Sequence, residues 1–338
     1  MKFLCALVLS ALAWGGAAWA QSAPTVPAWN LIWADEFDQP DGTSPDPARW
    51  TFDIGGNGWG NSELEYYTAR TNNARIVGGN LIIEADKETY TGSDRTTRAY
   101  TSARLKTQNL ASWTYGRFEA RIQIPFGQGI WPAFWTLGNT INSAGWPACG
   151  ELDIMENIGR EPTTVHGTAH GPGYSSTGIT FQRSTLPIQA YSAAYHLYAV
   201  QWAPGIIQFL VDNKIYGTIT SNSIPPGGQW VFASPEFLLL NVAVGGQWPG
   251  NPDSTTTFPQ FMKVDYVRVY AATQAPAPVL SVTSSGTNWV AHWDGRFPHA
   301  TLQYSASFPP QWGPVEITGA RSGDEFLENI KPGYYRLQ

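Results

Sequence analysis

The stretch Gly116-Arg117-Phe118-Glu119-Ala120-Arg121-Ile122 alternates between polar and apolar side chains. Successive side chains of a β-strand point to opposite faces, so this period of two predicts a strand with one face in an apolar core. Short runs rich in β-branched and aromatic residues also occur at 80–85, 206–211 and 264–270. We expect all four segments to be strands around one core.

Clusters of Gly, Pro and Asn separate such runs throughout residues 30–270. No long stretch carries a convincing apolar repeat of 3.6 residues, which a helical protein would need. Many short strands spaced by turns are typical of two packed sheets. The predicted fold class is therefore all-β, a sandwich or a jelly roll, with a small β-domain after it.

Composition narrows the classes of protein further. The 338 residues are 43% hydrophobic and only 14% charged, with 34 Gly, 25 Pro and 16 Trp. The hydrophobic content is ample for a core, which excludes disorder throughout. The formal net charge is −6, and a nucleic-acid partner would require a basic patch, so none is expected.

The first twenty residues have the pattern of a signal peptide. Lys2 precedes an apolar core over 3–12, and Ala18-Trp19-Ala20 forms a small-x-small cleavage site. The alternative is a membrane anchor, but the apolar run is too short to span a bilayer. We predict a protein secreted to the extracellular space or the periplasm, with no membrane association after cleavage. Cys149 then has no partner for an intrachain disulfide, and we interpret it as a packed thiol.

The chain divides into four predicted parts. Residues 1–20 are the signal peptide, 21–271 the main β-domain, 272–278 a Pro-containing linker, and 279–338 a small β-sandwich-like accessory domain. The tryptophans of the accessory domain could bind sugar or fill a small core, and the sequence favours the core.

Three acids fall within six residues of this charge-poor chain, in Gly150-Glu151-Leu152-Asp153-Ile154-Met155-Glu156. On a helix they would not share a face. On a regular strand Glu151 and Asp153 share a face, but Glu156 has the wrong parity. One extra residue, a β-bulge near Ile154 and Met155, turns all three acids to the same side while apolar neighbours enter the core.

Such a bulged strand would bring the two glutamate carboxyls to roughly 5–6 Å, the separation of a retaining glycosidase. That chemistry needs one ionised carboxylate as nucleophile and one protonated acid. A third acid between them would raise a neighbour's pKa by repulsion and could hydrogen-bond the other. A calcium site or a solvated polar strand face is the alternative interpretation of the same pattern.

The segment 151–156 resembles the catalytic motif of glycoside hydrolase family 16, in the longer form of its laminarinase (endo-β-1,3-glucanase) branch. Further segments over about 30–270 resemble the family in the same order. They are Trp33-Ala34-Asp35-Glu36-Phe37, Gly58-Trp59-Gly60-Asn61-Ser62-Glu63-Leu64-Glu65-Tyr66-Tyr67, Ser102-Ala103-Arg104-Leu105, Gly129-Ile130-Trp131-Pro132-Ala133-Phe134-Trp135, His166-Gly167-Thr168-Ala169-His170-Gly171 and Leu240-Asn241-Val242-Ala243-Val244-Gly245-Gly246, followed by Trp248-Pro249-Gly250.

The resemblance implies that the fold is a β-jelly-roll sandwich of the concanavalin-like kind. It also implies that residues 21–271 are a catalytic domain, with Glu151 as nucleophile, Glu156 as general acid/base and Asp153 as the assisting acid. It implies substrate-binding positions that line glucan subsites at Asn61, Arg104, Trp131, Trp135, Trp146, His170 and Trp248. No cofactor is expected for catalysis. A structural calcium ion is implied at the backbone carbonyls of Glu36 and Gly79 and at Asp265, all of them oxygen donors that suit a hard cation.

The expected activity is endo-hydrolysis of internal β-1,3-glucosidic bonds, with mixed β-1,3/1,4 linkages also accepted, by a retaining double displacement. The expected partner is a laminarin-like β-glucan, bound by a monomer. Two alternatives stay open. The chain could be a non-catalytic β-glucan recognition protein, which the presence of both glutamates argues against, or a related hydrolase of another β-linked polysaccharide.

Overall fold

The computed structural model describes residues 29–184 and 190–273 in full, and the backbone of the strands between 280 and 337. Within these residues two large antiparallel sheets dominate, and the only α-helix is the single turn α1 (Ile141–Ala144). Two short 3-10 turns, η1 (Tyr191–Ala193) and η2 (Ser221–Ser223), complete the helical elements of this part. No helix in the described residues is long and apolar enough to cross a membrane.

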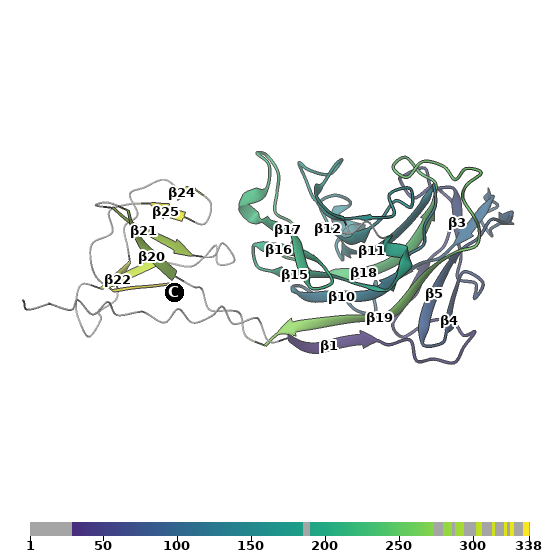
Figure 1. Cartoon of the computed structure of the whole chain (residues 1–338), viewed down its shortest axis with the longest axis horizontal. Helices are drawn as coiled ribbons and strands as arrows, with labels where there is room; N and C mark the ends of the chain where they lie inside the picture. The colour runs from purple at the N-terminus through teal and green to yellow at the C-terminus, as the bar shows by residue number, and fades with distance from the viewer. Residues whose placement is uncertain are drawn as a thin grey trace, which may run out of the picture.

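The first sheet has eight strands and the second has seven. Figure 1 labels the strands of the first sheet, and β12, β11 and β18 of the second. The eight-stranded sheet runs in the order β17 (Lys214–Thr220), β16 (Ile206–Val211), β15 (His196–Ala203), β10 (Gly116–Gln123), β19 (Gln260–Ala272), β5 (Asn80–Ala85) and β4 (Ala74–Val77), with β1 (Trp29–Asp35) also paired to β19. The seven-stranded sheet runs in the order β14 (Ile179–Ser184), β13 (Thr164–His170), β12 (Glu151–Glu156), β11 (Ile130–Gly138), β18 (Glu236–Val244), β9 (Arg104–Lys106) and β2 (Thr51–Asp53).

Smaller strand groups accompany the two sheets. Two pairs join loops of the main unit: β3 (Glu65–Tyr67) with β8 (Tyr100–Ser102), and β6 (Tyr90–Thr91) with β7 (Thr97–Arg98). The strands after residue 279 form two sheets of their own, β20 (Leu280–Ser285) with β21 (Asn288–Trp293), β25 (Glu325–Leu327) and β24 (Arg321–Ser322), and β23 (Gly313–Pro314) with β22 (Leu302–Ser305) and β26 (Tyr334–Leu337). The predicted signal peptide and most of the linker lie outside the described residues.

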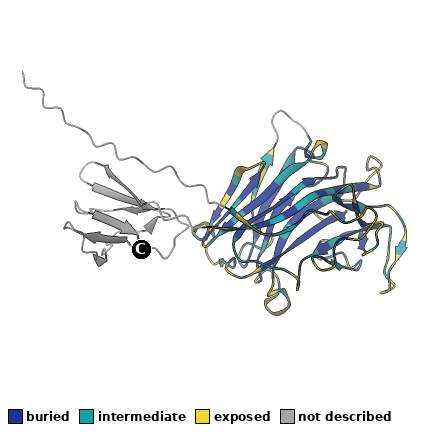
Figure 2. Ribbon diagram, turned by 90° about the horizontal axis from the view of Figure 1, so that it is seen from below, coloured by how far each residue is buried: buried dark blue, intermediate teal, exposed yellow. Residues whose placement is uncertain are grey.

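The core lies between the two large sheets, as the alternation predicted. Phe118, Ala120 and Ile122 of β10 are fully buried. Leu152 of β12 belongs to the same apolar cluster, as do alternate residues of β11 and β18. Figure 2 shows the buried residues following the strands of both sheets. The all-β sandwich predicted from the sequence is confirmed.

A second, smaller apolar cluster lies on the other face of the seven-stranded sheet. It contains Leu137, Cys149, Phe237 and Leu239, with Trp135 packed against it. Cys149 is 2% exposed, and burial raises the pKa of its thiol to about 11. The thiol is therefore a packed side chain and not a nucleophile. This outer face of the sheet carries the candidate site.

Candidate active site

Strand register places the three acids on one face of the seven-stranded sheet. Across from β12, Leu137 pairs with Glu151, Trp135 with Asp153, and Ala133 with Glu156. These β11 partners are two residues apart, so they share a face, and the acids opposite them share it too. The register shifts by one residue between Asp153 and Met155. The bulge predicted near Ile154 and Met155 is confirmed.

The bulge fits because its extra residue is apolar and packs in the main core. Ile154 and Met155 are both fully buried in the main core. On β13, Thr168 pairs with Asp153 and His166 with Glu156, so Gly167 alone faces the two bulged residues. A Cβ atom at Gly167 would lie 2.5 Å from the Tyr216 hydroxyl. Only a glycine leaves room here for the Tyr216 and Phe209 side chains that pack against this strand.

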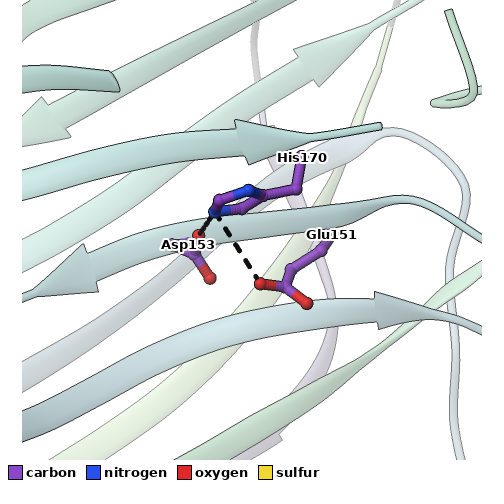
Figure 3. A group of neighbouring side chains, drawn as sticks. All are labelled: Glu151, Asp153 and His170. Carbon is purple, nitrogen blue, oxygen red and sulfur yellow. Dashed lines mark ion pairs between the residues drawn. The ribbon is translucent and has the colours of Figure 1, made fainter. Parts of the chain in front are cut away.

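Glu151, Asp153 and His170 converge on one another (Figure 3). His170 Nε2 lies 3.1 Å from Asp153 Oδ2 and 3.9 Å from Glu151 Oε1. The opposite ring nitrogen, Nδ1, lies 2.8 Å from the carbonyl oxygen of Ser175, which orients the imidazole. Glu151 and His170 are half-buried, whereas Asp153 is 4% exposed. Asp153 is thus enclosed, whereas Glu151 stays partly exposed to solvent.

Burial raises the pKa of each of the three acids to about 8, against the usual value near 4. The charge of Asp153 adds to the effect on both glutamates and His170 opposes it, and at Glu156 the hydrogen bond from Trp131 opposes it as well. Neighbouring carboxyls with raised pKa values cannot all ionise at neutral pH, so the cluster retains protons. One ionised carboxylate beside a protonated acid is the state that glycoside hydrolysis requires.

The ligating atoms of Glu151, Asp153 and His170 all lie within 4.8 Å of one another, the only such group among the described residues. That spacing is also compatible with a cation. Binding a cation here would require ionised carboxylates, in competition with the protons that the raised pKa values of Glu151 and Asp153 retain.

Glu156 is held by an indole. Trp131 Nε1 donates a hydrogen bond of 3.0 Å to Glu156 Oε1. The ring of Trp131 packs edge-on against Trp248, with 5.4 Å between centroids. Both tryptophans are half-buried on the face that carries the acids. The structure therefore brings these two predicted substrate-binding residues to the predicted acid/base.

Arg104 lies between two aromatic rings. Its guanidinium carbon is 4.8 Å from the centroid of Trp59 and 4.7 Å from that of Trp135. Asp53 Oδ2 lies 3.0 Å from Arg104 Nε and holds the charge in place. A planar guanidinium stacks on aromatic faces in this way, which an ammonium cannot reproduce. The structure thus joins the predicted residues Arg104 and Trp135 and adds Trp59 and Asp53 to them.

Asn61 and Trp135 are connected through a buried polar chain that the sequence did not reveal. Asn61 Nδ2 donates to Glu63 Oε1 at 3.1 Å, and the Tyr67 hydroxyl donates to Glu63 Oε2 at 3.0 Å. Asn241 Nδ2 then donates to the Tyr67 oxygen at 3.1 Å, and Trp135 Nε1 donates to Asn241 Oδ1 at 2.8 Å. The only sequence signal was the presence of these residues in family-like segments, without any indication of their contacts.

The remaining predicted residues lie farther out. Trp146 is 49% exposed, and its ring centroid is 6.0 Å from that of His170, so it borders the site. For the predicted calcium site, Arg121 Nη1 lies 2.7 Å from Asp265 Oδ2, so calcium would have to share this carboxylate with a guanidinium. Gly79 lies in the turn between β4 and β5, and the Glu36 side chain pairs with Arg268.

A fourth carboxyl, Glu236, lies close to the acids but on the core side of the sheet. Glu236 pairs with Gly138 across β18 and β11, and the Thr136 hydroxyl donates a hydrogen bond to Glu236 Oε2. Burial raises the pKa of Glu236 to about 8, and the charge of Glu151 raises it further. The charge of Glu236 in turn raises the pKa of Asp153. The run 236–244 reads as a continuous buried strand, so the sequence offered no sign of this proximity.

A sandwich of antiparallel sheets with two half-buried glutamates on one outer face defines a glycoside hydrolase of the jelly-roll class. The chain belongs to the glycosyl hydrolases family 16, whose family model matches residues 62–268. The resemblance seen in the sequence is therefore confirmed.

Individual relatives agree with this membership. A beta-glucanase of Rhodothermus marinus is 46% identical over 252 residues, which cover 72% of this chain and 86% of that protein. The catalytic domain of an endo-1,3-beta-glucanase (laminarinase) from Thermotoga petrophila RKU-1 superposes with a TM-score of 0.70 at 44% identity, covering 74% of this chain and all of that one (100%). A variant of a non-specific endo-beta-1,3(4)-glucanase of the same family, co-crystallised with 1,3-beta-D-cellobiosyl-cellobiose, gives a TM-score of 0.66 at 38% identity, covering 74% of this chain and 98% of that one.

Proposed function

We propose that this protein is a secreted endo-β-1,3-glucanase that cleaves internal bonds of laminarin-like β-glucans with retention of the anomeric configuration. The observation that carries the proposal is the register of β12, which turns Glu151, Asp153 and Glu156 to one face. The endo-1,3-β-glucanase names of the relatives supply the linkage. The non-specific relative supports additional action on mixed β-1,3/1,4 linkages.

In the first step Glu151 attacks the anomeric carbon while Glu156 gives its proton to the glycosidic oxygen. The carbon–oxygen bond to the leaving sugar breaks, and a covalent glycosyl-enzyme forms with inverted configuration. In the second step the Glu156 carboxylate takes a proton from water, and the water oxygen displaces Glu151. Two inversions restore the β configuration.

Asp153 and His170 assist without touching the leaving sugar. A protonated Asp153 can share its hydrogen with Glu151 while that group is a carboxylate, before the first step and after the second, which spreads the nucleophile's charge. His170, 3.1 Å from Asp153, keeps this acid in place. Asp153 and His170 thus influence the charge and position of the nucleophile, while Glu156 protonates the leaving group.

The direct test replaces Glu151 by glutamine, which keeps the shape and removes the nucleophile. Turnover of laminarin should fall by roughly 10⁴-fold or more, because the covalent step is lost. Glu119→Gln is the matched control: it makes the same chemical change in a buried acid of β10, a strand of the other sheet. It should keep turnover within a few-fold. An active Glu151→Gln enzyme would refute the assignment.

Stereochemistry and cutting pattern test the finer claims. Proton NMR of the first product should show the β anomer, whereas the α anomer would indicate inversion. Viscosity of a β-glucan solution should fall faster than reducing ends appear, because internal cuts shorten chains most. Hydrolysis of lichenan beside laminarin would establish mixed-linkage activity, and hydrolysis of agarose or carrageenan alone would indicate another polysaccharide.

A glucan-recognition protein without activity is the competing function. The orientation and pKa values of the three acids favour catalysis, because binding alone does not need a retained proton next to a nucleophile. If the wild-type protein bound laminarin tightly and released no reducing sugar, it would be a glucan-recognition protein and not an enzyme.

Export, calcium and assembly complete the proposal. Cleavage after Ala20 predicts a mature protein that begins at Gln21, which N-terminal sequencing of culture supernatant tests. Structural calcium at the carbonyls of Glu36 and Gly79 and at Asp265 predicts a higher melting temperature with calcium than with chelator. We propose a monomer that binds no nucleic acid, which light scattering and a gel-shift assay can check.

A further inference from the structure

Trp131 has a contact that sugar stacking does not explain. Its indole Nε1 donates to Glu156 Oε1 at 3.0 Å, on the half-buried face that carries the acids. Trp135 lies four residues further along the same strand and faces the same side, but its Nε1 donates to the amide oxygen of Asn241. The two tryptophans therefore look alike in sequence and differ in what their N–H groups hold.

A second layer of side chains fixes the Trp131 ring. Trp248 packs edge-on against it, and His166 packs edge-on against Trp248 with 4.9 Å between centroids. His166 is 4% exposed and pairs directly with Glu156 across β12 and β13. Arg160 Nη1 donates to the carbonyl oxygens of Trp248 and Pro249 at 3.0 and 2.6 Å, which ties this loop down.

We infer that Trp131 is a positioning residue for the general acid/base, holding Glu156 through its indole N–H while Trp248 and His166 hold the indole. The inference rests on the proposed function, since it assigns Glu156 the proton transfer. A role in sugar binding at the same ring is compatible with it. Glu156 Oε1 accepts the hydrogen bond from the indole, so the transferable proton of Glu156 is on Oε2.

Holding one oxygen has consequences for both steps. In the first step the carboxyl cannot rotate to present Oε1, so Oε2–H stays aimed at the glycosidic oxygen. Once the proton has left, the same N–H donates to a carboxylate, and a hydrogen bond to the charged form is stronger than one to the neutral acid. The contact therefore lowers the pKa of Glu156, against the stronger opposing effect of burial.

The test is Trp131→Phe, which keeps an aromatic ring and removes the donor. With laminarin, kcat should fall about tenfold to a hundredfold while KM changes less than threefold, the loss expected for a hydrogen bond to a charged group. The alkaline limb of the pH profile should move up by about one unit, because the lost donor had favoured the ionised form. Trp135→Phe is the matched control and should leave the pH limb in place.

A substrate that needs no proton isolates the first step. With 2,4-dinitrophenyl β-laminaribioside the leaving phenolate departs unprotonated, so the pre-steady-state release of dinitrophenolate by Trp131→Phe should stay within about threefold of wild type. Site-specific incorporation of 3-benzothienylalanine at position 131 replaces N–H by sulfur in a ring of the same shape, and should reproduce the laminarin defect without a change in melting temperature.

The outcomes separate the two proposals. Wild-type protein that fails to hydrolyse laminarin would overturn the proposed function itself. An active wild type with a Trp131→Phe variant that loses activity equally on both substrates, at an unmoved pH limb, would overturn only the positioning role. A benzothienylalanine enzyme with wild-type kcat would overturn it as well.

Discussion

Replacing Tyr67 by phenylalanine should destabilise the protein much more than the same change at Tyr198. Both tyrosines are fully buried. The Tyr67 hydroxyl joins Glu63 to Asn241, which are 4% and 6% exposed. The hydroxyl of Tyr198 has no hydrogen-bond partner among the described residues. The two variants thus remove the same hydroxyl, which is hydrogen-bonded on both sides at Tyr67 and has no partner at Tyr198.

The magnitude follows from what each change leaves behind. Tyr67→Phe strands a carboxylate oxygen and an amide N–H away from water, each costing about 1–3 kcal/mol, so about 4 kcal/mol is a central value for the pair. In a domain of this size that corresponds to a melting temperature lower by roughly 8–16 °C. Tyr198→Phe leaves no polar group without a partner and removes a buried hydroxyl that had none, so the free energy of unfolding should stay within about 1 kcal/mol of wild type.

Urea unfolding followed by tryptophan fluorescence measures both free energies, with equal slopes confirming that the same surface unfolds. Catalysis offers a second readout, because Asn241 also holds the indole of Trp135. Tyr67→Phe should therefore raise KM for laminarin, whereas Tyr198→Phe should not. Equal stabilities of the two variants, within 0.5 kcal/mol as a rough experimental error, would refute the account of the buried polar chain.

Three further predictions concern the packing of Gly167, the stacking of Arg104 on Trp135, and the dependence of turnover on pH. Gly167→Ala should lower both activity and melting temperature, because the new Cβ would lie 2.5 Å from the Tyr216 hydroxyl; a variant as stable as wild type would show that the strand has room there. Arg104→Lys should raise KM for laminarin about tenfold and leave kcat nearly unchanged, since an ammonium cannot stack on Trp135; steady-state kinetics decides. Turnover should decline as pH rises above about 8, because Glu156 then loses the proton that it donates, and a rate still increasing at pH 9 would contradict this role.

The sandwich was predictable because the pattern that encodes it is local. In 116–122 every second side chain is apolar, and those residues are fully buried in β10. Parity reasoning also anticipated the bulge, since three acids in six residues can share a face only if one residue is extra. Both inferences use nothing beyond the geometry of a single strand.

The supporting contacts of the site could not be predicted in this way. Tyr67 and Asn241 are 174 residues apart in the chain, Trp135 and Asn241 are 106 apart, and Trp131 is 25 residues from Glu156. Which strands become neighbours depends on the topology of the whole sheet, and no periodicity in one segment records it. Glu236 illustrates the same limit, because its distance to the acids depends on the pairing of β18 with β11.

Alternation along the chain was therefore sufficient to determine the strands, the face that carries the acids and the irregular backbone that aligns them, since each depends on neighbours one or two residues away. The order of strands in the sheet, the indole that holds Glu156 and the buried links between Asn61 and Trp135 were decided only on folding. Their hydrogen bonds join segments that meet because burying two apolar sheet faces against each other is favourable, and that gain belongs to the assembled sandwich as a whole.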